Sequence, residues 1–202
     1  MSLSKNRPEY YISIDVEADG PCAGLNSMLQ FGAVFYDADE NVLAEYEANI
    51  REIEGAKPDL STMRWWAEQD EKRPGLWANM MTDRVSATVA MQKFQDIVTD
   101  VSAKEKCAPV VVAYPALFDT SYTYYYCHRF LGSSPFGFSA LDIKTMGMVV
   151  SKSSYHGSSK KNYPNNWFNP EFRHDHTALA DARGQGYTFF RMLERAGELS
   201  IG

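Results

Sequence analysis

Residues 10–17, Tyr10-Tyr-Ile-Ser-Ile-Asp-Val-Glu17, identify both a core strand and the first part of a candidate site. The run is apolar up to residue 16, which predicts a buried β-strand. A strand places residues i and i+2 on one face, about 6–7 Å apart, so the aliphatic residues should face one way and Asp15 and Glu17 the other. Two carboxylates side by side at the end of a core strand repel each other and resist burial. The pair therefore predicts a metal site.

The remaining chain continues with two more strand patterns and then alternates helices with short strands, which predicts an α/β fold. We expect a mixed sheet with antiparallel first strands and helices on both faces, and a ligand crevice at the strand ends. The expected strands are 10–16, 30–36, 42–50, 109–114 and 140–143, and the expected helices are 59–69, a longer one through 90–101, 122–131 and about 178–198. Ser61 or Thr62 is the expected cap of the first helix.

Length and composition predict one globular domain over residues 1–202, with its core at about 10–198. No apolar stretch approaches the ~20 residues of a membrane span, and the N-terminus lacks the apolar core of a signal peptide. Three widely spaced cysteines without a CxxC pattern indicate reduced thiols. We therefore expect a cytoplasmic protein with no membrane partner.

Charge is unevenly distributed along the chain. The net charge of −6 argues against a general nucleic-acid coat protein. Residues 144–173, however, carry five basic residues and one acid, a local excess of +4. This segment is either a solvated flexible loop or an arm that contacts phosphate. From residue 151 onward the segment is longer than a loop that merely connects two elements in a compact domain.

Two further acidic signals lie downstream of the Asp15–Glu17 pair. Asp119 follows the apolar run 109–114, and His176 precedes Asp181 at the start of the last helix. Alone, Asp119 could be a helix N-cap, His176 a surface histidine, and Asp181 a first-turn acid that complements the helix dipole. The order of all three signals is more specific than any one of them.

At these residues the chain resembles the DEDDh family of 3′–5′ exonucleases, which includes oligoribonuclease and RNase T. The matching motifs are Ile14-Asp-Val-Glu17, Gln30-Phe-Gly-Ala-Val34, Phe118-Asp119, Leu141-Asp142 and His176-Thr-Ala-Leu-Ala-Asp-Ala182. With Trp65-Trp66-x-x-Gln69 and the chain length, they are similar to a compact single-domain, exoribonuclease-like branch. One departure is that Tyr114 and Pro115 stand where many members have His-Asn or Gly-Asn. The resemblance implies a ribonuclease-H-like fold.

The resemblance also implies a two-metal hydrolysis of phosphodiester bonds. Two divalent cations, Mg²⁺ or Mn²⁺, can stabilise both the attacking and the leaving oxygen of an in-line displacement. Asp15 is implied as the bridging ligand, with Glu17 and Asp181 completing one ion and Asp119 holding the other. His176 is implied as the general base that activates the attacking water. The product would be a nucleoside 5′-monophosphate.

Several other residues are weaker candidates. His174 is expected to be a loop histidine, and Asp142 is expected to fix local backbone rather than bind metal. Adjacent helical residues cannot share one face, so one of Trp65 and Trp66 should be core and the other could line the cleft. Trp65 and Phe118 are the expected base-stacking residues. Tyr122 and Tyr124–Tyr126 are expected to pack in the fold instead.

The sequence therefore predicts a metal-dependent 3′–5′ exonuclease with single-stranded RNA as the favoured substrate. A single-stranded DNA exonuclease of the same mechanism is the first alternative. A catalytically silent nucleic-acid-binding module and a phosphodiesterase for small nucleotides are the others. A homodimer is a further expectation from the resemblance.

Overall fold

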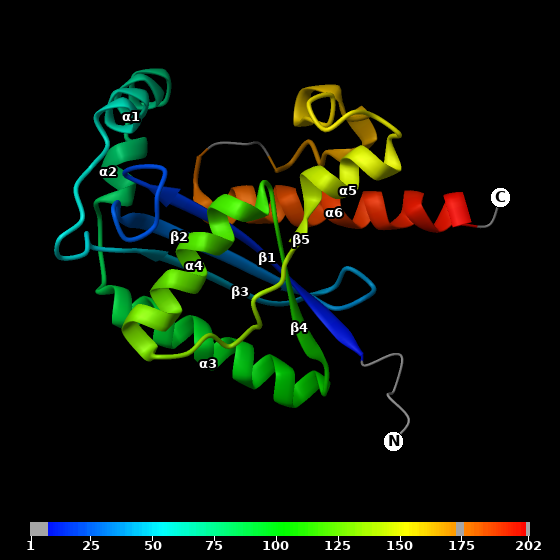
Figure 1. Cartoon of the computed structure of the whole chain (residues 1–202), viewed down its shortest axis with the longest axis horizontal. Coiled ribbons are helices and arrows are strands. Elements are labelled where there is room, and N and C mark those ends of the chain that lie inside the picture. Colours follow the sequence, from blue (N-terminus) through cyan, green and yellow to red (C-terminus); the bar gives the residue numbers. More distant parts are fainter. Residues whose placement is uncertain (1–7, 173–175, 201–202) are drawn as a thin grey trace.

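The computed structural model describes residues 8–172 and 176–200, which form one mixed sheet flanked by helices (Figure 1). In chain order the elements are β1 (Glu9–Ala18), β2 (Met28–Tyr36), β3 (Val42–Asn49), α1 (Leu60–Lys72), α2 (Leu76–Met80), α3 (Ala87–Glu105), β4 (Ala108–Ala113), α4 (Ala116–Leu131), β5 (Leu141–Asp142), α5 (Ile143–Val150), the 3₁₀ turns η1 (Lys160–Asn162) and η2 (Asn165–Trp167), and α6 (Ala178–Ser200).

The sheet of the described residues has the strand order β3-β2-β1-β4-β5. Strand β2 pairs antiparallel with both β1 and β3, whereas β4 runs parallel to β1 and β5 parallel to β4. This confirms the predicted mixed sheet. The last strand is shorter than predicted, because only Leu141 and Asp142 pair with β4. The chain then turns at once into α5.

Helices cover both faces of the sheet, as predicted (Figure 1). The even-numbered side chains of β1, from Tyr10 to Ala18, pack with α3 and α4 in the larger hydrophobic cluster. On the opposite face, Val34 and Tyr36 of β2 pack against α6. Gly32 lets α6 approach closely, because a Cβ there would lie 2.2 Å from the backbone of Ala178. The start of α6 is therefore held directly against β2.

Two helix starts differ from prediction. The N-cap of α1 is Asp59, not Ser61 or Thr62, and its side chain accepts a hydrogen bond from Thr62 N. Helix α4 begins at Ala116, six residues before the predicted start at 122, with Pro115 as its N-cap residue. The cause lies outside the helix, since the Asp142 carboxylate accepts a hydrogen bond of 2.8 Å from Ala116 N. Asp119 therefore lies inside the first turn and is not a cap.

The basic segment is a folded arm where the structure describes it. Residues 151–172 carry both 3₁₀ turns, and Tyr163 and Trp167 are buried in the cluster against α6. Thr188 of α6 donates a hydrogen bond of 2.9 Å to the Trp167 carbonyl. The flexible-loop reading is therefore wrong for these residues. Over residues 8–172 and 176–200, the helices are all too short or too polar to cross a lipid bilayer.

Candidate active site

The two carboxylates of β1 lie where the strand leaves the sheet's core. Asp15 and Glu17 are each 9% exposed, and both lie on the face of β1 that is turned toward α6. Asp15 Oδ1 accepts a hydrogen bond of 2.5 Å from Gln185 Nε2 on α6. One turn earlier on α6, Ser13 of β1 donates a hydrogen bond of 2.7 Å to the Ala182 carbonyl. The strand and the helix therefore fix each other at the level of the acids.

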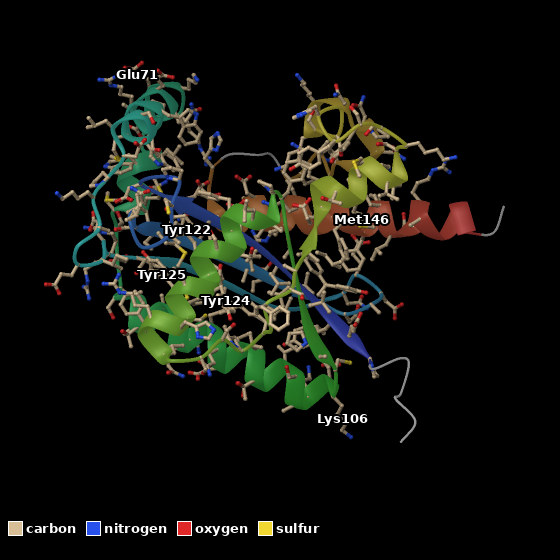
Figure 2. All side chains as sticks on the ribbon, viewed as in Figure 1. Glu71, Lys106, Tyr122, Tyr124, Tyr125 and Met146 are labelled. Atoms are coloured by element: carbon tan, nitrogen blue, oxygen red, sulfur yellow. The ribbon has the colours of Figure 1, made fainter. Side chains whose placement is uncertain are left out.

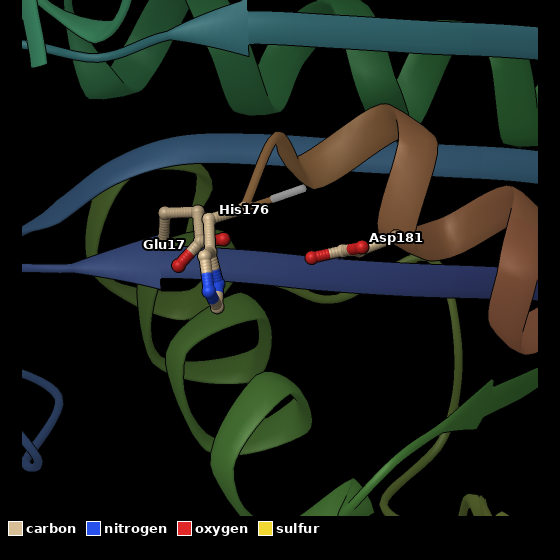
Figure 3. Close-up of side chains that lie close together, drawn as sticks. All are labelled: Glu17, His176 and Asp181. Atoms are coloured by element: carbon tan, nitrogen blue, oxygen red, sulfur yellow. The ribbon is translucent and has the colours of Figure 1, made fainter. Parts of the chain in front are cut away.

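The start of α6 brings His176 and Asp181 to the end of β1. The carbonyl oxygen of the Gln30 side chain accepts a hydrogen bond of 2.8 Å from Ala178 N, which ties the first turn of α6 to β2. His176 has a φ of 58°, a left-handed conformation that side-chain-bearing residues rarely adopt. In Figure 3 the His176 side chain lies directly beside that of Glu17, and the Asp181 carboxylate lies next to both.

Glu17, His176 and Asp181 form a compact group of metal-ligating atoms. One carboxylate oxygen of each acid and one ring nitrogen of His176 all lie within 4.8 Å of one another. The three side chains come from β1, from the residue that follows the undescribed 173–175, and from the first turn of α6. Positions far apart in the sequence thus meet at one strand end, as the motif order predicts.

Asp119 joins this group from α4. The pairing of β1 with β4 ends at Ser13, so Val16 N has no strand partner on that side. It donates instead to Asp119 Oδ1 at 3.0 Å. The other oxygen, Asp119 Oδ2, is buried and has no hydrogen-bond partner among the described residues. A buried carboxylate oxygen without a donor is costly unless a cation meets it.

The electrostatics of the site fit bound cations. Burial raises the pKa of Glu17 well above its usual range, and the charges of Asp15, Asp181 and Asp119 raise it further. Burial and the charge of Asp15 do the same to the pKa of Asp119. The four carboxylates offer hard oxygen ligands of the kind that Mg²⁺ and Mn²⁺ take. The residues present therefore suit divalent cations.

The paired tryptophans of α1 divide as expected. Trp66 is 2% exposed, and its indole N–H donates a hydrogen bond of 2.9 Å to the Ala18 carbonyl at the end of β1. Trp65 is 38% exposed, and its ring lies edge-on to the His176 ring with 5.0 Å between centroids. Trp66 is thus the core residue, and Trp65 lies beside the candidate base.

The weaker candidates have different outcomes. Phe118 is half-buried against Tyr122, with ring centroids 5.2 Å apart, so its stacking role stays a prediction. Tyr122 and Tyr126 are fully buried, as expected of packing residues, whereas Tyr124 is 38% exposed. Figure 2 shows Tyr122, Tyr124 and Tyr125 along α4. His174 lies outside the described residues.

Asp142 fixes local backbone, as predicted. One carboxylate oxygen accepts from Thr145 N at 2.6 Å and caps α5. The other accepts from Ala116 N, as described above for the start of α4. Both oxygens are therefore used in holding helix starts, and the start of α4 in turn positions Asp119.

Sequence reasoning missed three residues of the site. Gln185 lies one turn after Asp181 on the same face of α6, a spacing that could have indicated it. Gln30 lies within a recognised motif, but its contact with α6 spans 148 positions. Lys160 reaches the site from the basic arm, and its charge opposes the raised pKa of both Glu17 and Asp119. No periodicity singles out one lysine of an irregular segment.

Known proteins resemble this chain over most of its length. The model of the 3′–5′ exoribonuclease Rv2179c-like domain matches residues 10–191. The 3′–5′ DNA exonuclease Cap18 of Escherichia coli is 31% identical over 191 residues, which are 94% of each chain.

Solved structures support the fold. A 3′-exonuclease structure that describes 3′-end specific recognition of a histone mRNA stem-loop has a TM-score of 0.66 at 13% identity, over 92% of this chain and 63% of that one. The nuclease domain of 3′hExo, a DEDDh family member bound to rAMP, has a TM-score of 0.60 at 13% identity over 92% of both chains. E. coli exonuclease I with a dT13 oligonucleotide has a TM-score of 0.63 at 13% identity, over 96% of this chain and 43% of that one.

The solved structures confirm the expected ribonuclease-H-like fold. The family model and the E. coli relative show that the chain is a 3′–5′ exonuclease. It belongs to the Rv2179c-like family of 3′–5′ exoribonuclease domains.

Proposed function

We propose that this protein is a divalent-cation-dependent exonuclease that removes nucleotides from the 3′ end of single-stranded RNA. The observation that carries the proposal is the meeting of Glu17, His176 and Asp181 within 4.8 Å, with the unpartnered Asp119 Oδ2 buried close by. RNA is favoured because the family model that spans residues 10–191 describes an exoribonuclease.

Each side chain has a proposed role. Asp15, Glu17, Asp119 and Asp181 would hold two divalent cations, Mg²⁺ or Mn²⁺. Cations held there stabilise negative charge on the attacking and leaving oxygens of an in-line displacement. His176 takes a proton from the attacking water, since its ring lies beside the acids and imidazole exchanges protons near neutral pH. The water oxygen forms a new bond to phosphorus as the P–O3′ bond breaks. The 3′ oxygen of the shortened strand takes up a proton from solvent, and a nucleoside 5′-monophosphate leaves.

Gln185 and Trp65 support this chemistry. The Gln185 amide fixes one oxygen of Asp15 and so holds the carboxylate in one orientation. Trp65 presents a partly exposed ring beside His176, where the base of the terminal nucleotide can stack. Phe118 is proposed as a second stacking surface next to Asp119.

Single-stranded DNA is the second candidate substrate. It is favoured by the 31% identity to a protein described as a DNA exonuclease. Both candidates share one mechanism, so the comparison between polymers decides between them.

We further propose that residues 10–198 act as one catalytic domain, that the protein is cytoplasmic and that it forms a homodimer. Light scattering tests the last point.

The test is hydrolysis of matched strands. A 5′-labelled single-stranded RNA and the DNA of the same sequence are mixed with the purified protein in Mg²⁺, Mn²⁺ or EDTA. A ladder that shortens from the 3′ end, faster on RNA, and that EDTA and Asp15→Ala both abolish, is the expected result. Faster shortening of DNA would select the second candidate. Intact strands with every cation would refute the proposed function.

A further inference from the structure

The basic arm places one lysine beside the acids. Lys160 lines a pocket of about 320 Å³ between the arm and α6, whose wall includes Asp181 and Gln185. The remaining lining is mostly aromatic and amide, with Phe168, Phe172 and Asn169. The Lys160 ammonium therefore lines the same pocket as Asp181, which is a proposed ligand of the divalent cations.

Lys160 is held in place by the arm's own packing. Ser158 is fully buried and donates a hydrogen bond of 2.7 Å to the Lys144 carbonyl at the start of α5. Its hydroxyl also hydrogen-bonds the Tyr163 hydroxyl at 2.9 Å. The turn that carries Lys160 is thus anchored on both sides, so its side chain starts from a fixed backbone.

In the described part of the chain, no acid forms an ion pair with the ammonium of Lys160. Its Nζ lies 4.9 Å from the ring centroid of Tyr114, at the end of β4. Among residues 8–172 and 176–197, Lys160 has no carboxylate within 4.0 Å. A cation–π contact orients the charge and leaves its hydrogen-bond donors available.

The positive charge of Lys160 beside the acids requires an explanation, because it weakens the binding of divalent cations to those acids. A nucleic-acid strand supplies one, since each linkage brings a negative phosphate. The pocket offers an ammonium for such a phosphate and aromatic walls for the adjoining sugar and base.

We propose that Lys160 is a substrate-binding residue that contacts a backbone phosphate of the nucleic-acid strand in the pocket between the arm and α6. This inference rests on the proposed function for the identity of the ligand. It gives a role to one of the five basic residues of segment 144–173. Lys161, which is exposed on the same turn, is a matched control.

The test is binding without turnover. A fluorescent ten-nucleotide single strand is titrated with the full-length wild-type, Lys160→Met, Lys160→Arg and Lys161→Met proteins in EDTA, at several salt concentrations. Methionine keeps an unbranched side chain of similar length and removes the charge. A hydrogen bond to a charged group has a net free energy of about 1.5–3 kcal/mol, so Lys160→Met should weaken binding about 10- to 100-fold.

Salt dependence separates a phosphate contact from a structural effect. Loss of one contact should lower the slope of log affinity against log salt by about 0.7. Lys160→Arg should recover most of the affinity, and Lys161→Met should bind within about 2-fold of wild type. Wild-type affinity and slope in Lys160→Met, or equal losses in both methionine variants, would overturn the inference.

The same samples are run on a gel to keep the two proposals apart. Shortening of the strand by the wild-type protein in EDTA would refute the cation-dependent mechanism and leave the Lys160 comparison valid at early times. With cations added, Lys160→Met should raise KM more than it lowers kcat. A rise in the cation concentration needed for half-maximal rate, with KM unchanged, would instead assign Lys160 to the acid cluster and overturn the inference.

Discussion

The two faces of β1 differ in character: one packs in the apolar core, and the other carries the acids of the candidate site. The even-numbered face, from Tyr10 to Ala18, is buried in the apolar cluster with α3 and α4. From Ser13 onward the odd-numbered face is also buried but polar, with Ser13 bonded to the Ala182 carbonyl of α6 and Asp15 bonded to Gln185. Glu17 continues that face into the acid cluster.

The difference shows how the fold tolerates a repulsive group of charges. Burial of one large aliphatic side chain stabilises a protein by about 1.5–3 kcal/mol. The apolar face of β1 buries several such side chains. The polar face and the neighbouring Asp119 of α4 oppose folding whenever their carboxylates are ionised without a counterion, as the raised pKa values of Glu17 and Asp119 indicate. The apolar face therefore holds the acids at positions that their repulsion would otherwise change.

The largest expected effect comes from the polar side of this comparison. His176→Ala should lower kcat by about 10²- to 10⁴-fold, because a general base contributes about that much. Thermal unfolding should show little change, since His176 is only half-buried. Single-turnover rates measure the effect, with the exposed His156→Ala as the matched control. A rate within a few-fold of wild type would remove His176 from the mechanism.

The next effect comes from the apolar face. Ile12 is fully buried, so Ile12→Ala should lower the free energy of unfolding by about 2–5 kcal/mol, and Ile12→Val by about 0.5–1.5 kcal/mol. The rate per folded molecule should stay near that of wild type. Urea denaturation and hydrolysis at low temperature measure both quantities. A loss of rate without a loss of stability would contradict the division between the faces.

The smallest of these effects concerns the contact that joins the polar face to α6. Gln185→Ala removes the hydrogen bond to Asp15, and loss of such a supporting contact costs about 10- to 100-fold in metal affinity or activity. Rates measured against cation concentration should show the change. Gln92→Ala, on the exposed side of α3, is the control. An unchanged cation dependence would show that Asp15 needs no support from α6.

Much of this division could be predicted from the sequence because it depends on local spacing. Alternation along residues 10–17 predicts the two faces of β1, and the five-residue spacing from His176 to Asp181 predicts the two residues that meet Glu17. The start of α4 could not be predicted from the sequence, because Ala116 N donates its hydrogen bond to Asp142, 26 positions away. Lys160 could be placed only from the fold, since it lies in an irregular segment without periodicity, whereas the four-residue spacing from Asp181 could have indicated Gln185.

The pH dependence of the cation-free protein follows from the same charges. A carboxyl whose pKa is raised on folding binds its proton more tightly in the folded state than in the unfolded one. Its stabilising contribution is complete below the unfolded pKa and is lost as pH rises through the folded pKa. Because Glu17 and Asp119 are both raised, stability in EDTA should fall from the ordinary carboxyl pKa, about 4.3, upward. Bound divalent cations should oppose that fall.

The most direct measurement is thermal unfolding of Glu17→Gln beside wild type, at pH 7.5, in EDTA and in Mn²⁺, together with hydrolysis of a single strand. Glu9→Gln, at the exposed end of the same strand, is the control. The account predicts that Glu17→Gln melts higher than wild type in EDTA, by about 2–4 °C for each kcal/mol of relieved repulsion. It also predicts less stabilisation by Mn²⁺ and no hydrolysis. A variant that melts lower in EDTA and still shortens the strand would contradict the claim that this cluster is kept for catalysis.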